Sequence, residues 1–411
     1  MTFRTKYQLT IHLPYLNAIL QQHTGYRINR ILISLPTEFM KIGVNTRFLL
    51  KNKMEGFGWY TYETMLRITQ QHPEHEFIFF FDRPFDEKFI FSDNITPVIV
   101  HPPARHTILQ KIWFDYSITR ALKKYECDIF VSPDGYLSLR AELPQLAVIH
   151  DLNFEHNPQD VPKDVLKFFK KRFPLFAKKA ARICTVSNFS KKDIMETYGI
   201  SADKIDVTYN GVSPLYKVIE ESKKQEIREK HTEGKPYIVF VGAIHKRKNV
   251  QRLIEAYKKL KKDEKIPHHL LLVGEPMWNS EAIELEPEMK EFIHFTGHVS
   301  INDLAEIMGS ATCLAFVSYF EGFGIPLVEA MQSGVPILAG NKTSLPEIGG
   351  DAVLYCDPYS VESIQSQLHL LLSDEELRNS LIEKGLERAK DFSWDYTARD
   401  LWLAIGKIID N

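Results

Sequence analysis

Long apolar runs and paired cysteines are the features that this sequence of 411 residues lacks. No stretch approaches the roughly 18 uninterrupted apolar residues that a membrane-spanning helix requires. The four cysteines are scattered without Cys-x-x-Cys or Cys/His spacing, which argues against a zinc site and against a disulfide framework. Residues 1–39 lack the basic, apolar and small-residue layout of a signal peptide. We therefore expect a protein of the reducing cytoplasm, either soluble or held peripherally at the inner face of the membrane.

The length and the composition indicate two folded domains. A chain of 411 residues is too long for one ordinary core, and 44% hydrophobic with 25% charged residues is typical of globular proteins. Basic residues are in excess over residues 1–215 and acidic residues over 216–411. A basic half is compatible with an anionic membrane or an acidic acceptor, and ordinary variation between domains accounts for it equally well. We expect no nucleic-acid partner.

Apolar runs alternate with helical patterns through the first half of the chain. After a first strand beginning at Met40 and a helix over 59–71, we expect strands near 76–81, 97–100, 127–132, 145–150, 182–186 and 205–208, and helices near 107–125, 162–180 and 188–198. This alternation predicts an α/β fold, a parallel sheet with helices on both faces. Because the sequence from Met40 reads as a self-sufficient start, we expect residues 1–39 to be a weakly packed extension and Met40 to be a plausible start codon.

A glycine-rich turn between a strand and a helix is the most informative feature of the second half. A buried-type strand over 313–317 leads through Gly322 and Gly324 into a helical pattern that starts at Pro326. Glycines let the backbone approach a ligand closely, and the uncapped N–H groups of a first helical turn attract an anion, most simply a phosphate.

Two carboxylates frame this turn, Glu321 before it and Glu329 about two helical turns later. Acids are unsuited to a phosphate, so we expect them to accept hydrogen bonds from the hydroxyls of a sugar or a ribose. The alternative is a loop acid and a surface acid without a ligand.

Three consecutive cations, Lys246, Arg247 and Lys248, follow a buried-type strand that ends at Gly242. They stand at the entrance of a helix, where side-chain charge and the helix dipole both favour an anion. A solvated basic turn is the alternative.

Two further positions lie at the carboxyl ends of expected strands, the edge at which open parallel sheets bind ligands. Gly56 and Gly58 belong to a short loop before the helix over 59–71, and a mere tight turn is the alternative. His150 ends the strand over 145–150, where a lone histidine is often structural.

The most basic segment covers residues 163–182 and mixes lysines and arginines with aromatic and aliphatic residues. Such a mixture is able to lie on an anionic bilayer. Since Pro174 interrupts it, a surface helix with its aromatic side against the sheet is the simpler account.

The string Phe-Glu-Gly-Phe-Gly-Ile-Pro-Leu-Val-Glu-Ala over residues 320–330 resembles the donor-binding signature of retaining, nucleotide-sugar-dependent glycosyltransferases of family four, which have the GT-B fold. The resemblance extends over nearly everything from Met40 onward. It implies two Rossmann-like, doubly wound parallel-sheet domains that face a central cleft, an acceptor-binding one over 40–214 and a donor-binding one over 215–391. It also implies a terminal helix, over 392–411, that crosses back to the first domain.

The resemblance assigns roles to individual residues. Catalytic roles fall on His150, Arg247, Lys248 and Glu321, and donor-binding roles on Gly56, Gly58, Gly242, Val299, Phe323, Gly324, Ile325, Leu327 and Glu329. Lys248 and Arg247 would neutralise the departing diphosphate. Glu329 would hold the ribose hydroxyls, Glu321 the sugar hydroxyls, and His150 the sugar beside the reacting carbon.

Other expectations concern what is missing from the pattern. Many relatives carry an arginine directly after the glycine at position 242, where this chain has Ala243, so one phosphate contact is lost or supplied otherwise. Ser187 is a further possible contact. No metal and no cofactor are expected beside the nucleotide sugar, because no Asp-x-Asp signature occurs where the cleft should lie.

The function implied is transfer of a hexose, with retention of configuration, from a nucleotide sugar to a hydroxyl of a glycan or lipid-linked acceptor in cell-surface polysaccharide synthesis. The string Val-Gly-Ala-x-x-x-Arg-Lys-Asn over residues 241–249 looks most like that of GDP-mannose-dependent enzymes, and a UDP-hexose donor fits nearly as well. A nucleotide-sugar epimerase, a sugar phosphorylase and a non-enzymatic subunit of a glycan-assembly complex are the alternatives.

Overall fold

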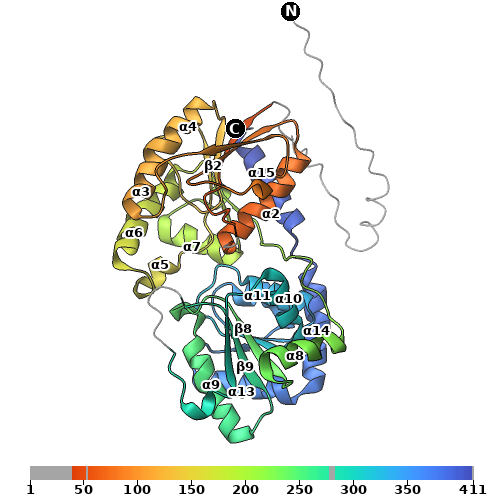
Figure 1. Ribbon diagram of the computed structural model, residues 1–411. Coiled ribbons are helices and arrows are strands. Elements are labelled where there is room, and N and C mark those ends of the chain that lie inside the picture. The colour runs from red at the N-terminus through yellow and green to blue at the C-terminus, as the bar shows by residue number, and fades with distance from the viewer. Residues whose placement is uncertain (1–38, 52–53, 277–282, 410–411) are drawn as a thin grey trace, which may run out of the picture. The chain divides into compact units, whose positions relative to one another are not determined.

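The computed structural model describes residues 39–51, 54–276 and 283–409 (Figure 1). Residues 38–411 group into one compact unit, which contains two parallel β-sheets. The expected extension over residues 1–39 lies outside the described residues, apart from Phe39. The boundaries expected after residues 214 and 391 stay predictions.

The first sheet has seven parallel strands in the order β3-β2-β1-β4-β5-β6-β7. Its strands are β1 (Lys41–Asn45), β2 (Glu76–Phe81), β3 (Ile95–Ile99), β4 (Ile129–Ser132), β5 (Gln145–Val148), β6 (Arg182–Thr185) and β7 (Ile205–Val207). The alternation expected from the sequence is confirmed. The strand order reverses between β1 and β4, the kind of switch point at which α/β sheets bind ligands.

Helices cover both faces of this sheet, which is why its strands are continuous apolar runs. The helices are α2 (Gly56–Gln71), α3 (Thr107–Ile112), α4 (Thr119–Lys124), α5 (Asn153–His156), α6 (Lys163–Lys179) and α7 (Asn188–Tyr198), with a π-helical turn over Trp113–Ile118. Along β2, Phe77 and Phe79 pack in the core that includes α2, whereas Ile78 and Phe80 pack in the core that includes α4 and α6.

The expectation of a loop at Gly56 and Gly58 is wrong. Helix α2 begins at Gly56, and the N–H of Trp59 already donates to the carbonyl oxygen of Glu55, at 2.9 Å. Gly58 is needed for packing, because a Cβ placed there would lie 2.7 Å from the carbonyl oxygen of Phe48. The two glycines therefore form the first helical turn.

The second sheet has six parallel strands in the order β10-β9-β8-β11-β12-β13. They are β8 (Tyr237–Val241), β9 (His269–Val273), β10 (Ile293–Gly297), β11 (Cys313–Phe316), β12 (Ile337–Gly340) and β13 (Leu354–Cys356). Its helices are α8 (Glu221–Thr232), α9 (Val250–Glu264), α10 (Ile301–Ser310), α11 (Ile325–Gln332), α12 (Leu345–Gly349), α13 (Val361–Ser373) and α14 (Glu375–Ala389). Two sheets of this kind, each wound with helices, are the expected GT-B arrangement.

The last helix, α15 (Trp394–Ile409), packs on the first sheet although the chain enters it from the second (Figure 1). Trp402 stacks on His72, the residue directly after α2, with ring centroids 3.8 Å apart, and Thr397 donates to the carbonyl oxygen of Tyr209 at 2.6 Å. The expected crossing helix is thus confirmed.

Candidate functional site

The loop from β11 to α11 is held in one conformation by hydrogen bonds to its backbone. The N–H of Glu321 donates to Thr343 Oγ1 at 3.0 Å, and Ser344 Oγ donates to the carbonyl oxygens of Glu321 and Phe323 at 2.9 and 3.0 Å. Gly324 has a φ of +99°, a conformation that disfavours any residue with a side chain. The sequence thus fixes where the Glu321 side chain projects.

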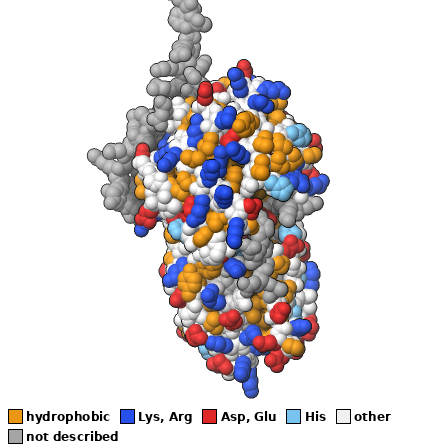
Figure 2. Space-filling view, turned by 90° about the vertical axis from the view of Figure 1, so that its left-hand side faces the viewer, with side chains coloured by type: hydrophobic (Ala, Val, Ile, Leu, Met, Phe, Trp, Pro, Cys, Tyr) orange, Lys and Arg blue, Asp and Glu red, His pale blue; other side chains and the backbone are white. Residues whose placement is uncertain are grey.

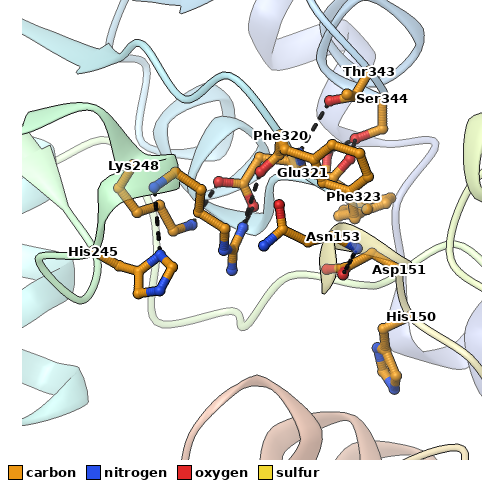
Figure 3. Close-up of polar contacts among 12 residues, drawn as sticks. His150, Asp151, Asn153, His245, Lys248, Phe320, Glu321, Phe323, Thr343 and Ser344 are labelled. Carbon is orange, nitrogen blue, oxygen red and sulfur yellow. Dashed lines mark hydrogen bonds and ion pairs between the residues drawn. The ribbon is translucent and has the colours of Figure 1, made fainter. Parts of the chain in front are cut away.

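The carboxylate of Glu321 is bound by two of the three cations of the basic turn over residues 246–248 (Figure 3). Arg247 Nη1 lies 2.7 Å from Oε2 and Lys248 Nζ lies 2.7 Å from Oε1. Burial of the carboxylate acts to raise its pKa, but the two positive charges outweigh burial and lower the pKa of Glu321 to about 2. We call Glu321, Arg247 and Lys248 the charged cluster; with one acid and two bases it keeps a net positive charge.

Helix α11 begins next to the charged cluster and carries the second acid. Gly324, the residue that precedes the helix at its N-cap position, has no side chain to cap it, and Pro326 has no N–H. Leu327 is buried in the core and its N–H donates to the carbonyl oxygen of Gly324 at 3.0 Å. Of the predicted donor contacts on this helix, the backbone of Gly324 and Ile325 is therefore best placed to meet a ligand.

Glu329 has no ion-pair partner among the described residues, unlike Glu321. Burial raises the pKa of Glu329 to about 7, and the neighbouring Tyr216 hydroxyl opposes this only in part. The Tyr216 hydroxyl is itself buried beside this carboxylate and lacks a well-formed hydrogen bond in the described part of the chain. A buried carboxylate with no cation and few hydrogen bonds to stabilise its charge is suited to accept hydrogen bonds from a ligand.

His150 lies two residues after the end of β5. Its Nε2 contacts the carbonyl oxygen of Pro133 at 2.8 Å, and burial lowers its pKa. The ring packs edge-on against Phe57 and Tyr60, with centroids 4.7 and 5.0 Å away. In Figure 3 this ring points away from the charged cluster.

The backbone of His150, in contrast, touches the loop that carries Glu321. A Cβ on Gly322 would lie 2.2 Å from the His150 carbonyl oxygen, and Ser187 Oγ donates to the Gly322 carbonyl oxygen at 2.6 Å. The expectation that Gly322 makes room for a ligand is therefore wrong, because the space serves contact with the first half of the chain. Ser187, expected only as a possible contact, joins the two halves.

The remaining predicted positions lie in loops of the half of the chain that carries the second sheet. Gly242 has a φ of +137° and borders Lys248, since a Cβ there would be 3.7 Å from Lys248 Cε. Phe323 is buried against Tyr209 and Phe392. Val299 is half-buried and lines an open cavity beside β10. Their contacts with a donor stay predictions.

Sequence reasoning missed several residues that join the halves. Glu347 of α12 accepts hydrogen bonds from the N–H groups of Asn188 and Phe189 at 2.7 and 2.8 Å, and Tyr319 donates to Asp160 Oδ2 at 2.8 Å. The sequence around Glu347 does not indicate these hydrogen bonds, because its partners Asn188 and Phe189 are far away in the chain.

Within residues 39–51, 54–276 and 283–409 the structure has no group of three or more His, Cys, Asp or Glu side chains arranged for a metal ion. Over the same residues, none of the helices combines the length and the apolar character that crossing a bilayer demands.

Comparison with known proteins covers both halves. The family model "Glycosyltransferase Family 4" matches residues 54–214 and "Glycosyl transferases group 1" matches residues 222–388. O-antigen chain mannosyltransferase B of Escherichia coli is 32% identical over 279 residues, which are 67% of this chain and 73% of that relative. O-antigen chain mannosyltransferase RfbU of Salmonella typhimurium is 28% identical over 69% of this chain and 77% of its own length.

Among solved structures, Anabaena HepE in complex with UDP-glucose superposes with a TM-score of 0.67 at 15% identity and covers 90% of this chain and 98% of HepE. That likeness concerns the fold. Taken with the matched family models and the 32% identical relative, it shows that the chain belongs to the group 1 glycosyltransferases and is a glycosyltransferase of GT-B fold.

Proposed function

We propose that the protein transfers mannose from GDP-mannose, with retention of configuration, to a hydroxyl of a glycan or lipid-linked acceptor. The observation that carries the proposal is the charged cluster of Glu321, Arg247 and Lys248 beside the start of α11, with Glu329 on the same helix. It combines positive charge for a diphosphate with two acids for hydroxyl groups.

The leaving group of such a reaction is a nucleoside diphosphate, so its developing negative charge is the main catalytic demand. Arg247 and Lys248 are half-buried, and charges in a partly dry site act more strongly than in water. Phosphate oxygens would take over these cations from Glu321. The carboxylate of Glu321 would then be released to accept hydrogen bonds from the transferred sugar.

Glu329 would bind the ribose. Its pKa of about 7 reflects burial without a cation, and two ribose hydroxyls would supply the hydrogen bonds that stabilise the charged form. This division of labour gives Glu321 and Glu329 different tasks on neighbouring parts of one ligand. His150, neutral and fixed by Pro133, would line the sugar beside the reacting carbon.

Mannose as the transferred sugar is supported by the two O-antigen chain mannosyltransferases among the relatives. Their name also supports a role in cell-surface polysaccharide synthesis. The identity of the donor nucleotide is less constrained than that of the sugar, because HepE was solved with UDP-glucose and has the same fold. A UDP-hexose is therefore the second choice of donor.

We also propose that the protein works in the cytoplasm, against the inner face of the membrane. Figure 2 shows Lys and Arg side chains interspersed with hydrophobic ones on one side of the molecule. On α6, the exposed residues Lys167, Lys171, Leu175 and Lys178 are spaced so that they lie on one side of the helix, and Ile108 of the neighbouring α3 is also exposed. Lysine charge and apolar side chains together favour an anionic bilayer. Arg172 does not contribute, because it is buried and paired with Asp115 at 2.6 Å.

One assay tests the reaction. The purified chain is incubated with GDP-mannose or UDP-glucose and with an α-mannoside acceptor, with and without excess chelator. We expect an α-linked product from GDP-mannose, seen in the anomeric NMR signals, at an undiminished rate in chelator. A β-linked product would refute retention, strict metal dependence would refute the metal-free mechanism, and epimerised donor without acceptor would refute transfer.

A further inference from the structure

A second cavity, of about 540 Å³, lies beside the charged cluster and is lined by both halves of the chain. Asn157 and Gln159 contribute from the first half, and His245, Arg252, Tyr319 and Tyr359 are among the residues from the second. His245 and Lys246 line it while their neighbours Arg247 and Lys248 bind Glu321. One short turn therefore serves two adjacent sites.

Two tyrosines form an aromatic wall in this cavity. The rings of Tyr319 and Tyr359 stack with centroids 5.8 Å apart and planes 23° apart. Tyr359 is 55% exposed, although the ring is large and apolar. The Arg252 guanidinium also lies over this ring, with Cζ 5.8 Å from its centroid. A half-exposed aromatic ring next to an arginine offers apolar contact and hydrogen-bond donors to a ligand ring.

The polar lining offers both donors and acceptors. Gln159 and Gln251 have side-chain amides for which the described residues provide no hydrogen-bond partner. Glu255 adds a pure acceptor and Arg252 a pure donor. A sugar hydroxyl both donates and accepts, so a neutral saccharide satisfies this set.

The aromatic wall is fixed to the reaction centre by hydrogen bonds. The N–H of Tyr319 donates to the carbonyl oxygen of Arg247 at 3.0 Å, and its hydroxyl donates to Asp160 Oδ2 at 2.8 Å. His245 Nε2 lies 3.0 Å from the carbonyl oxygen of the same Asp160. A ligand stacked on Tyr359 is thus held at a set position relative to Glu321, two residues after Tyr319.

We propose that this cavity, with Tyr359 as its stacking platform, binds the non-reacting sugar residues of the acceptor glycan. The inference rests on the proposed function, in which the charged cluster and Glu329 are already occupied by the donor. It gives the enzyme a reason to prefer a growing saccharide over a single sugar. No covalent step takes place at this site.

Binding to manno-oligosaccharides tests the inference without depending on turnover. Methyl α-mannoside and α-mannotriose are titrated calorimetrically into the protein saturated with GDP. We expect the wild type to bind the trisaccharide more tightly than the monosaccharide. Tyr359→Ala should weaken trisaccharide binding by roughly tenfold, as the loss of an aromatic anchor usually does, and Tyr359→Trp should retain it.

Tyr396→Ala is the matched control, because Tyr396 is also an exposed tyrosine beside an arginine, with Arg399 5.0 Å from its ring, but lies on α15. It should bind both saccharides as the wild type does. Equal trisaccharide affinity in Tyr359→Ala and the wild type would overturn the inference, as would a wild type that binds GDP but no trisaccharide at millimolar concentration. A wild type that binds neither GDP nor UDP would instead overturn the proposed function.

Discussion

Glu347 and Asn188 are 159 residues apart in the chain, yet the carboxylate of Glu347 accepts a hydrogen bond from the N–H of Asn188 at 2.7 Å. Asn188 is the first residue of α7 in the first half, and Glu347 belongs to α12 in the second. The same carboxylate accepts from the Tyr209 hydroxyl at 2.8 Å. An acid of one half therefore caps a helix of the other, where the helix dipole favours negative charge.

Removing the charge of Glu347 should weaken this contact. Glu347→Gln keeps the shape but loses charge-assisted hydrogen bonds at the start of α7, so we expect the melting temperature to fall by roughly 1–3 °C. Differential scanning fluorimetry measures the change. Glu383→Gln, at an exposed position of α14, is the control and should melt like the wild type. Equal melting temperatures for all three proteins would show that the contact does not stabilise the fold.

Removing one cation of the charged cluster should slow the reaction more than it weakens binding. Lys248→Ala deletes a charge that would stabilise the departing diphosphate, so we expect turnover to fall by one to three orders of magnitude. Steady-state kinetics with GDP-mannose give kcat and KM separately. Lys262→Ala, an exposed lysine on α9, should change neither. Wild-type turnover in Lys248→Ala would contradict the assigned role.

Glu329 should make donor binding depend on pH near neutrality. Its folded pKa of about 7 lies above the ordinary value of 4.5, so the folded state loses stability as pH rises from 4.5 to 7 and the group becomes charged. Ribose hydroxyls donate to the charged form, and we therefore expect GDP affinity to rise as pH increases through 7. Calorimetric titrations at pH 6, 7 and 8 measure this.

Glu329→Gln cannot titrate and serves as the comparison for that experiment. We expect weaker GDP binding that changes little between pH 6 and 8. An equally steep pH dependence in this variant would assign the titrating group elsewhere.

Charge reversal on α6 should abolish membrane binding. Lys167, Lys171 and Lys178 are exposed, and each lysine near an anionic surface contributes about 1 kcal/mol. We expect the wild type to co-sediment with vesicles that contain phosphatidylglycerol, and the variant with Glu at these three positions to stay in the supernatant. A variant with Glu at Lys262, Lys265 and Lys290 controls for net charge. No sedimentation of the wild type would refute the membrane proposal.

The sheets could be predicted because strands covered on both faces must be apolar throughout, as Phe77–Phe81 is. The charged cluster was also foreseeable in part, since Arg247, Lys248 and Glu321 lie in motifs at strand ends. The ion pairs of Glu321 with Arg247 and Lys248 were not foreseeable, because the motifs assign each of these side chains to a ligand. The start of α2 at Gly56 was missed because glycines usually signal a turn, whereas here the helix hydrogen bonds and the packing of Gly58 decide.

Contacts between the halves were beyond reach of the sequence. Gly322 and Ser187 look like ligand contacts when only their neighbours in the chain are considered. In the structure, Gly322 lies against the backbone of His150, and Ser187 donates to the carbonyl oxygen of Gly322. Both contacts are set by how the two halves of the chain pack together. The contacts of such residues depend on the tertiary structure, and the neighbouring residues in the sequence carry no information about it.

The packing of α15 on α2 has a consequence for biosynthesis. The first sheet emerges from the ribosome early, but the part of α2 that faces α15 stays uncovered until Trp402 and its neighbours over Trp394–Ile409 have been made. The nascent first half is therefore exposed to chaperones and to aggregation while about 200 further residues are translated, from the end of β7 at Val207 to the end of α15 at Ile409. A domain whose covering helix follows directly in the chain does not face this delay.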